Sequence, residues 1–292
     1  MPFLIMRLNW KEKPRVGVVG HTGMVGSQVF SYFYSRGFQV FGYSRSNKNG
    51  FPHASWEEIN GEADIIFVCV PTPYDFKKRN SDFSAIENVL AQIKGAKIVI
   101  IKSTVWPGTT DNLQEKFPHH ILIFNPEFLS RKTAKSDFEN PDRQIVGYTN
   151  KSQEIAKDIL SFLPQGKKNM IMRAAEAELI KYSHNVHGTI SILWANQLYE
   201  ISKKLNIDYE KVKEGFVASE FVGTGILRYM TIFHHGGKRG VGGPCFPKDL
   251  AAFIEFCKSI GVDAELPKAT RSANLRILKR QGLTEKLAEE IF

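Results

Sequence analysis

The stretch RVGVVGHTGMVGSQVFSYFYSRG, residues 15–37, decides the fold of this chain. It opens with a short β-branched run, RVGVVG, that ends in glycine. Its apolar residues then recur at helical spacing up to a glycine stop at Gly37. This order predicts a buried strand, a tight turn and a helix that begins directly after the turn.

Glycines fill the turn between this strand and this helix. Gly20, Gly23 and Gly26 form the pattern Gly-x-x-Gly-x-x-Gly, with Met24 and Val25 before the third glycine. Such glycines allow a tight bend and a close backbone approach, and a helix N-terminus offers N–H groups to the pyrophosphate of a dinucleotide. Glycines are also common in ordinary turns, so the position between a buried strand and a helix carries the interpretation. We expect these five residues to bind a cofactor.

Further short apolar runs follow at regular intervals. They are QVFGYS (39–44), ADIIFVCV (63–70), AKIVIIKS (96–103) and HILIFN (120–125). Nearly continuous apolar runs suit strands that are buried on both faces of a parallel sheet. Helical stretches at 84–95 and 110–117 lie between them. This alternation predicts an α/β fold with a Rossmann-like, doubly wound parallel sheet.

The character of the sequence changes near residue 173. LPQGKKNM (163–170) is typical of a break, and after it the strands are expected to stop. The remaining apolar patterns are helical and cover 174–206 (one long helix or two abutting ones), 208–218, 248–261, 267–281 and 284–292. We therefore expect a dinucleotide-binding domain over 1–173 and an all-helical central domain over 174–292.

Composition narrows the class of partner. The 292 residues carry a formal net charge of +9, which favours an anionic partner. The basic residues are scattered, without the basic stripe and interleaved aromatics of nucleic-acid-binding modules. A phosphate-bearing small molecule is therefore expected in place of nucleic acid.

Apolar runs, cysteine number and Cys/His spacing bear on the cellular compartment and on metal binding. No apolar run approaches the ~20 residues that span a bilayer, and the N-terminal stretch lacks the features of a signal peptide. Cys69, Cys245 and Cys257 are an odd number of cysteines, which favours a reducing compartment. No Cys/His spacing of a zinc module occurs. We expect a cytoplasmic protein without a metal site or a membrane partner.

The end of the second predicted strand bears on the choice of cofactor. NAD-selective folds place an acidic residue there to bind the ribose hydroxyls. This sequence has Tyr43-Ser44-Arg45-Ser46, without an acid. A guanidinium flanked by hydroxyls suits a 2′-phosphate, so the cofactor is NAD or NADP, with Ser44 and Arg45 leaning to NADP. The alternative is an ordinary surface arginine.

Six short stretches together resemble a known family. They are VPTP (70–73), IKSTVWPGTT (101–110), NPEFLS (125–130), PDRQIVG (141–147), AELIKYSHN (177–185) and GGPCFPKD (242–249). In this order they resemble the UDP-glucose/GDP-mannose dehydrogenase family over about residues 15–280. The resemblance implies an enzyme that oxidises the C6 alcohol of a UDP- or GDP-sugar to a uronate and transfers two hydrides to NAD(P).

The resemblance also implies roles for the residues of the last motif. Cys245 matches a nucleophile that holds the sugar as a thiohemiacetal and then a thioester, which divides a difficult oxidation into easier steps. Asp249 matches a carboxylate that orients or activates water, and Lys248 matches a lysine near the cofactor. Gly242 belongs to the part that meets the substrate. A packed structural turn around Cys245 is the alternative.

Further roles fall on the earlier motifs. Lys181 and Asn185, four residues apart on one helix face, match the pair that stabilises the oxyanion at C6 and contacts the substrate. Glu127 and Thr104 match groups that hold a catalytic water. Snorkelling of Lys181 and a helix-capping role for Glu127 are the alternatives.

The remaining matches concern binding. Phe128 and Leu129 resemble the segment that meets the sugar. Pro71, Thr72 and Thr104 lie in the motifs beside the cofactor, and the turn that contains Thr104 would flank the nicotinamide.

The sequence departs from the family pattern in its glycine loop, usually Gly-x-Gly-x-x-Gly, and in the missing acid after the second strand. Members also usually continue into a further α/β domain that covers the nucleotide, whereas this sequence ends after its helical region. Because members pair through that region, we expect a homodimer. The alternatives are a two-electron hydroxy-acid-type dehydrogenase and a catalytically silent cofactor-binding protein.

Overall fold

The chain folds into two compact units. The computed structural model describes residues 13–46, 50 and 52–291. The first unit, here called the sheet unit, comprises the described residues up to Thr72 together with Asp82–Lys181. The second, here called the helical unit, comprises Pro73–Ser81 together with the described residues from Tyr182 onward.

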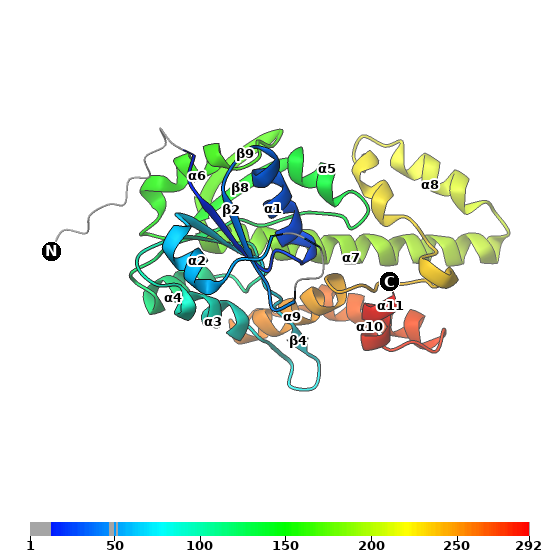
Figure 1. Cartoon of the computed structure of the whole chain (residues 1–292). Helices are drawn as coiled ribbons and strands as arrows, with labels where there is room; N and C mark the ends of the chain where they lie inside the picture. The colour runs from blue at the N-terminus through cyan, green and yellow to red at the C-terminus, as the bar shows by residue number, and fades with distance from the viewer. Residues whose placement is uncertain (1–12, 47–49, 51, 292) are drawn as a thin grey trace. The chain divides into compact units, whose positions relative to one another are not determined.

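A seven-stranded sheet forms the centre of the sheet unit (Figure 1). In spatial order its strands are β2 (Val40–Tyr43), β1 (Val16–Val19), β3 (Ile65–Val68), β6 (Ile98–Ile101), β7 (Ile121–Phe124), β8 (Arg143–Tyr148) and β9 (Lys168–Arg173). Neighbouring strands are parallel except for β7 and β8, which are antiparallel. Because β2 and β3 lie on opposite sides of β1, the strand order reverses there, and ligands of such sheets bind outside the carboxyl ends of the strands at that reversal.

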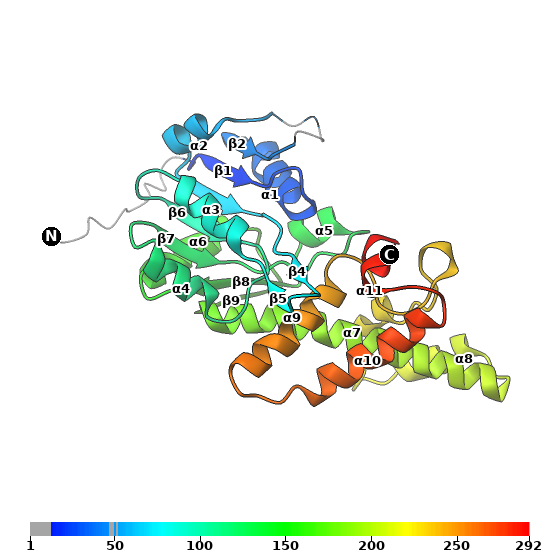
Figure 2. The same cartoon turned by 90° about the horizontal axis from the view of Figure 1, so that it is seen from below.

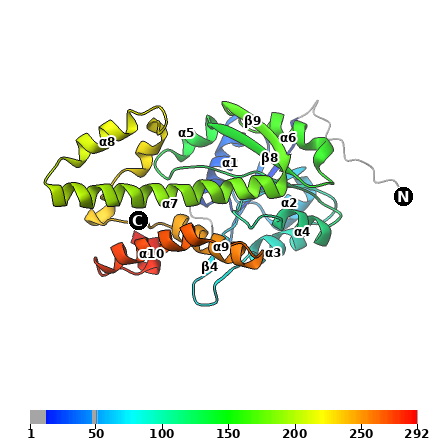
Figure 3. The same cartoon turned by 180° about the vertical axis from the view of Figure 1, so that it is seen from behind.

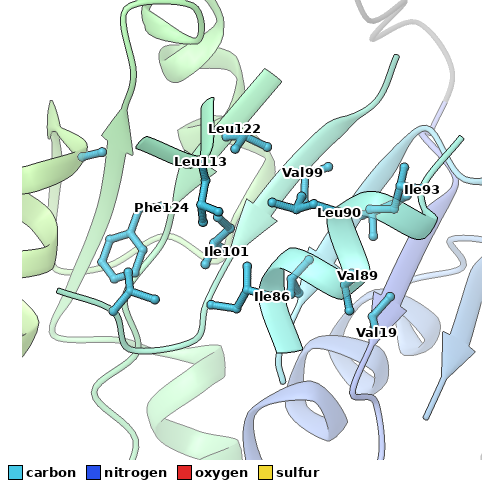
Figure 4. Close-up of a cluster of buried hydrophobic side chains, with 14 of the residues drawn as sticks. Val19, Ile86, Val89, Leu90, Ile93, Val99, Ile101, Leu113, Leu122 and Phe124 are labelled. Atoms are coloured by element: carbon cyan, nitrogen blue, oxygen red, sulfur yellow. The ribbon is translucent and has the colours of Figure 1, made fainter. Parts of the chain in front are cut away.

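Helices cover both faces of this sheet. They are α1 (Met24–Ser35), α2 (Trp56–Glu62), α3 (Ser84–Gln92), α4 (Thr109–Lys116), α5 (Ala134–Glu139), the 3-10 helix η1 (Gln153–Ile155) and α6 (Ala156–Phe162). One face packs under α2, α3, α4 and the first turns of α7 (Ala174–Leu205). Figure 4 shows Leu90 of α3 and Leu113 of α4 beside Val99, Ile101 and Leu122 of the sheet.

The opposite face packs under α1, α5 and α6 and is rich in aromatic rings. The ring of Phe33 stacks on that of Phe162 with centroids 4.6 Å apart and also lies 5.5 Å from the ring of Phe67. All residues of β1, β3 and β6 are buried, as expected for strands covered on both faces. Replacement of a fully buried phenylalanine such as Phe33 by alanine costs about 3–5 kcal/mol.

The helical unit is built around the continuation of α7. This helix of 32 residues begins in the sheet unit and enters the helical unit without interruption, and Figure 3 shows it along its whole length. It is followed by α8 (Tyr209–Val217), the 3-10 helices η2 (Thr224–Tyr229) and η3 (His235–Gly237), α9 (Phe246–Ser259), α10 (Glu265–Lys279) and α11 (Glu285–Ile291). Helices α9 and α10 pack against each other (Figure 2). Within the described ranges, no helix is long and apolar enough to cross a membrane.

A small hairpin from the first half of the chain belongs to the helical unit. Its strands, β4 (Tyr74–Asp75) and β5 (Asn80–Ser81), are antiparallel and contact α9. Tyr74 is buried, and the guanidinium of Arg271 on α10 lies 5.7 Å from the centre of the Phe76 ring. The described residues of 174–292 form only helices and loops, as expected for the helical part, and the two strands come from outside that range. The hairpin itself was not predicted, because two-residue strands are too short to leave a periodic pattern.

The predicted fold class, a Rossmann-like sheet followed by a helical region, is confirmed. The interpretation of 163–170 as a plain break was wrong, because β9 begins at Lys168. This edge strand pairs only with β8 and has mostly exposed residues, so it lacks the buried apolar run of the other strands.

Candidate active site

The loop after β1 runs very close to the backbone around it. Gly20 has a left-handed φ of 91°, and a Cβ on it would lie 2.4 Å from the carbonyl oxygen of Cys69. A Cβ on Gly26 would lie 2.2 Å from the carbonyl oxygen of Gly20. Neither position has room for a side chain, so the two glycines are fixed by packing as well as by conformation.

The first turn of α1 offers unoccupied donors beside this loop. Gly23 is the N-cap, it provides no side-chain cap, and the turn contains no acidic residue. The backbone N–H groups of Met24, Val25 and Gly26 have no intrahelical acceptor, as for any first helical turn. The turn lies at the reversal of strand order between β2 and β3. This set of donors fits the pyrophosphate of a dinucleotide.

The end of β2 separates two residues that the sequence grouped together. Ser44 is buried, its Oγ lies 3.0 Å from Nδ1 of His21, and it accepts the N–H of Thr22 at 3.2 Å. A Cβ on Gly42 would lie 2.6 Å from the His21 ring, so a glycine is needed there to seat the ring. The Ser44 hydroxyl therefore fastens the glycine loop to β2, whereas Arg45 is exposed.

The loops that follow β3 and β6 are joined by hydrogen bonds. Thr72 donates from Oγ1 to the carbonyl oxygen of Thr104 at 2.8 Å, and Ser103 donates from Oγ to that of Val70 at 2.6 Å. Thr72 is buried, Thr104 is half-buried and Pro71 is exposed. The hydroxyl of Thr72 thus acts within the protein and positions Thr104.

A buried ion pair joins α7 to the loop after β7. Lys181 donates from Nζ to Oε1 of Glu127 at 2.9 Å and to the carbonyl oxygen of the same residue at 2.7 Å, with side chains 6% and 9% exposed. The N–H of Leu129 donates to Oε2 of Glu127 at 2.7 Å. Desolvation raises the pKa of Glu127, but Lys181, this N–H group and Lys102 outweigh it and hold the pKa below its usual value. Glu127 is therefore ionised at neutral pH.

Two cations of the same unit lie near the ring of Phe128. Nζ of Lys181 is 5.5 Å from the centre of its ring, and the guanidinium of Arg143 is 3.8 Å from it. Such contacts are attractive because the ring face is electron-rich. Phe128 and Leu129 are both half-buried, so the first contributes its ring and the second its N–H group to the surroundings of Lys181 and Glu127.

The sequence interpretation missed Lys102, a second lysine in this region. Its Nζ donates to Oδ1 of Asn125 at 2.6 Å, and the Asn125 amide donates to Oε1 of Gln144 at 2.7 Å. Burial lowers the pKa of Lys102 to about 8, against the attraction of nearby Glu127. A lysine directly after the apolar run of β6 was the only signal in the sequence, since its partner Asn125 follows another strand, β7.

In the helical unit, Cys245 is the N-cap of α9. Pro247 lies in the first turn of the helix, and Gly243 before it has a left-handed φ of 74°. Cys245 and Gly242 are half-buried. The loop is therefore conformationally restricted on both sides of the sulfur, which lies at the positive end of a helix of 14 residues.

Asp249 connects three of the predicted site residues. Asn185 donates from Nδ2 to Oδ2 of Asp249 at 2.5 Å, and Lys248 donates from Nζ to Oδ1 at 2.5 Å. The Asp249 side chain is 1% exposed, and that of Lys248 is 16% exposed. Both oxygens of this carboxylate are occupied, so Asp249 fixes the amide of Asn185 and the ammonium of Lys248.

A glycine explains why α7 approaches the start of α9 so closely. A Cβ on Gly188 would lie 2.8 Å from the ring of Phe246, the first residue of α9. Gly188 follows Asn185 by three residues, so both lie on the same side of α7. The close approach brings Asn185 within hydrogen-bonding distance of Asp249.

Cys69 is half-buried and Cys257 is buried, and the described residues show no disulfide. Desolvation raises the pKa of Cys69 to about 12, and burial raises the pKa of Cys257 on α9. Among the residues that the structure describes, no group of three His, Cys, Asp or Glu side chains could hold a metal ion.

Each unit thus brings its own candidate residues together. Glu127 and Lys181 meet in the sheet unit, whereas Cys245, Asn185 and Asp249 belong to the helical unit. Lys181 and Asn185 are one helical turn apart on α7.

Comparison with known proteins agrees with these features. The NAD binding domain model of the UDP-glucose/GDP-mannose dehydrogenase family matches residues 39–163, and the central domain model of the same family matches residues 175–276. The chain is 30% identical over 252 residues to a UDP-glucose 6-dehydrogenase of Pseudomonas aeruginosa, an alignment that covers 81% of this chain and 53% of the relative. The chain spans about half the length of the curated relatives it matches first.

Solved structures are similar over most of the chain. A UDP-glucose dehydrogenase from the archaeon Pyrobaculum islandicum matches with a TM-score of 0.77 and 26% identity, covering 94% of this chain and 73% of that one. A UDP-D-ManNAc dehydrogenase from Pyrococcus horikoshii shares the fold with a TM-score of 0.76 at 21% identity, covering 92% and 70%. The two family models together match well over half of the 292 residues. The chain therefore belongs to the UDP-glucose/GDP-mannose dehydrogenase family.

Proposed function

We propose that this protein is a nucleotide-sugar 6-dehydrogenase, which oxidises the C6 alcohol of a UDP- or GDP-sugar to a carboxylate. The observation that carries the proposal is the group in the helical unit: a cysteine at the N-terminus of α9, with Asp249 holding Asn185 and Lys248. A packed turn needs neither a half-buried thiol nor a buried carboxylate with both oxygens occupied. Family membership supports the same reaction.

The thiol chemistry follows from the half-buried Cys245. When bound, the nicotinamide accepts a hydride in each of the two oxidations. The first oxidation yields an aldehyde, and the hydroxyl proton passes to a water held by Glu127. The thiolate adds to the aldehyde carbon and the oxygen takes a proton, which gives a thiohemiacetal. Loss of a second hydride and a proton gives a thioester, and water then breaks the C–S bond to give the carboxylate, the thiol and one proton released to solvent.

The charges around these groups fit their proposed roles. Lys181 and Asn185 stabilise negative charge on the C6 oxygen, because fixed donors favour charge that develops in a transition state. The lowered pKa of Glu127 keeps it ionised and able to hold a water together with Thr104. Asp249 fixes Asn185 and holds Lys248 near the helix terminus, where the helix dipole and the ammonium favour the thiolate. Phe128, Leu129 and Gly242 contact the sugar.

For the cofactor, we propose a preference for NADP over NAD. With the Ser44 hydroxyl occupied by His21 and Thr22, it rests on Arg45, which is exposed at the end of β2 and has the fork geometry that binds phosphate. The bound cofactor would contact the first turn of α1, and Pro71, Thr72 and Lys248 complete its proposed surroundings.

We also propose that two copies pair through α7. Trp194, Ile201 and Leu205 are 45%, 42% and 64% exposed, and their spacing places them along one face of the helix. Exposed apolar groups of this size mark interaction surfaces. Analytical ultracentrifugation tests this proposal: the wild type should sediment as a dimer and the Trp194→Glu/Ile201→Glu variant as a monomer, whereas a monomeric wild type would contradict it.

One stoichiometry tests the proposed reaction. The full chain is mixed with a limiting amount of UDP-glucose or GDP-mannose and an excess of NAD or NADP. Two reduced cofactors per sugar are expected. One reduced cofactor per substrate would indicate the two-electron hydroxy-acid type of chemistry, and cofactor binding without reduction for any sugar would indicate a catalytically silent protein.

A further inference from the structure

A fully buried carboxylate lies outside the groups described so far. Glu178, on the second turn of α7, is 0% exposed and belongs to the sheet unit. Its Oε2 accepts the N–H of Gly108 at 2.6 Å, and its Oε1 accepts both the N–H of Thr110 at 2.9 Å and the hydroxyl of Thr110 at 2.6 Å. Both oxygens are therefore used, and both are directed to one turn.

That turn is the start of α4, which lacks a cap of its own. Gly108 is the N-cap, it has a left-handed φ of 89°, and it has no side chain to accept the first N–H groups of the helix. Buried helix ends need acceptors for those groups. Glu178 supplies them from another helix, so the conformation of residues 104–110 depends on a carboxylate that is distant in sequence.

The chemistry of the side chain matters, because a glutamine could not replace it. A carboxylate has two acceptor oxygens, whereas an amide has one acceptor oxygen and an NH₂ group that would face a donor. Burial of a carboxylate is costly, and desolvation raises the pKa of Glu178 to about 7 against its three hydrogen bonds. Burial of a neutral side chain would cost less free energy, but a neutral amide could not accept hydrogen bonds with two oxygens from the two N–H groups.

Glu178 also belongs to a set of bonds that joins three neighbouring strand-end loops. Lys181, three residues further along α7, holds Glu127 in the loop after β7. Thr72 in the loop after β3 holds Thr104, at the start of the turn that Glu178 caps. These loops lie at the carboxyl ends of β3, β6 and β7, where sheets of this kind bind their ligands.

We propose that Glu178 is a positioning residue that holds the 104–110 turn in the shape required for oxidation. The inference rests on the proposed function, in which Thr104 holds a catalytic water and the turn flanks the nicotinamide. Glu178 touches neither substrate nor cofactor, because its oxygens are occupied and enclosed. Loss of the Glu178 carboxylate should change the position of the turn beside the nicotinamide end of the cofactor. The donors of α1 should still bind the rest of the cofactor.

The first test reads the turn directly. Trp106 lies within it, and the chain contains four tryptophans, so 5-fluorotryptophan labelling should give separate ¹⁹F NMR signals with the Trp106 signal assigned by Trp106→Phe. Glu178→Gln should shift or broaden the Trp106 signal without ligand, and amide exchange in 105–113 should become faster. The matched control is Glu176→Gln, because Glu176 is exposed two residues away and should leave both readouts unchanged.

The second test separates positioning from a purely structural role. With NAD(P) and the accepted nucleotide sugar, Glu178→Gln should lower kcat by about tenfold to a hundredfold with KM for the cofactor within about twofold. Thr110→Val removes only the hydroxyl bond. It should change the Trp106 signal and kcat in the same direction as Glu178→Gln, but by less. It also tests the turn if Glu178→Gln fails to fold.

The possible outcomes are distinct. An unmoved Trp106 signal in both variants would overturn the proposal, as would a shifted signal with unchanged kcat. If the wild type oxidises no nucleotide sugar, the proposed function fails. In that case the positioning role is judged by addition of cofactor: it predicts that NAD(P) shifts the Trp106 signal of the wild type but not that of Glu178→Gln, and equal responses would overturn it.

Discussion

The two units of this protein each bury a carboxylate beside a lysine, but they hold it differently. Glu127 in the sheet unit lies on a loop, and its lysine also binds the backbone carbonyl of the same residue. Asp249 in the helical unit lies in the first turn of a helix and divides its oxygens between a lysine and an amide. In the sheet unit, Lys181 keeps the Glu127 carboxylate ionised. In the helical unit, the Asp249 carboxylate holds Lys248 and Asn185 in place.

The largest effect is expected at the thiol that the helical arrangement surrounds. Cys245→Ala should lower the rate of nucleotide-sugar oxidation by about three orders of magnitude or more, because no thioester can form. Cofactor reduction measured at 340 nm checks this, with cofactor binding retained. Cys257→Ala on the same helix is the matched control and should leave the rate unchanged. A fully active Cys245→Ala variant would end the thioester proposal.

A stability difference between the two lysines is expected next. Lys181→Met leaves Glu127 as a buried charge without its main partner and should lower the free energy of unfolding by about 3–5 kcal/mol. Lys248→Met should cost less, about 1.5–3 kcal/mol, because Asp249 keeps its bond from Asn185. Denaturant titration measures both, with exposed Lys94→Met as a control near zero. Equal losses would show that the two carboxylates are held alike.

The pH dependence of stability should then distinguish two acids of the sheet unit. The pKa of Glu178 is raised to about 7 from 4.5, so the folded state binds the extra proton between these values. The free energy of unfolding should fall as pH rises through this window, on the order of 3 kcal/mol, and Glu178→Gln should remove the fall.

Glu127 should behave in the opposite way, because its pKa is lowered in the folded state. Its stabilising contribution is present above the ordinary pKa and is lost as pH falls through the folded pKa. The free energy of unfolding is measured against pH for the wild type and for Glu178→Gln and Glu127→Gln. The difference between the wild type and each variant gives the slope that each carboxylate contributes. Slopes of the same sign would contradict the assignment of one carboxylate destabilised by burial and one stabilised by its partners.

The smallest effect concerns Arg45. Arg45→Ala should weaken NADP binding by about tenfold, because one charge-assisted pair to the 2′-phosphate is lost, and leave NAD binding unchanged. Isothermal titration with each cofactor measures the ratio, with Arg36→Ala as a control. An equal loss for NAD and NADP would show that Arg45 does not read the 2′-phosphate.

The parts of the fold that were predictable are those with strong burial periodicity. The fully buried strands β1, β3 and β6 left continuous apolar runs, and α7 left a long helical pattern without proline. The edge strand β9 left no such pattern because its side chains are mostly exposed. Helix α2 had a usable signal that was overlooked: Ser55 and Glu58 form a capping box at its start.

The candidate site divides in the same way. Cys245 and Asp249 stand in a local motif, so the sequence indicated them directly. Glu178 and Lys102 act through partners that are distant in sequence, at the start of α4 and in the loop after β7, which a sequence pattern does not reveal. The burial of Ser44 could not be predicted either, because it depends on the His21 ring that packs over Gly42.

The raised pKa values of two of the three thiols make it possible to count intact sites by alkylation. Alkylating reagents attack thiolates, and the pKa of Cys69 at about 12 together with the raised pKa of Cys257 keeps both in the protonated form at neutral pH. Half-buried Cys245, at a helix N-terminus, is left as the reactive position. Iodoacetamide at neutral pH should therefore attach once per folded chain, and the amount of label bound would count the intact sites in a preparation before any substrate is known.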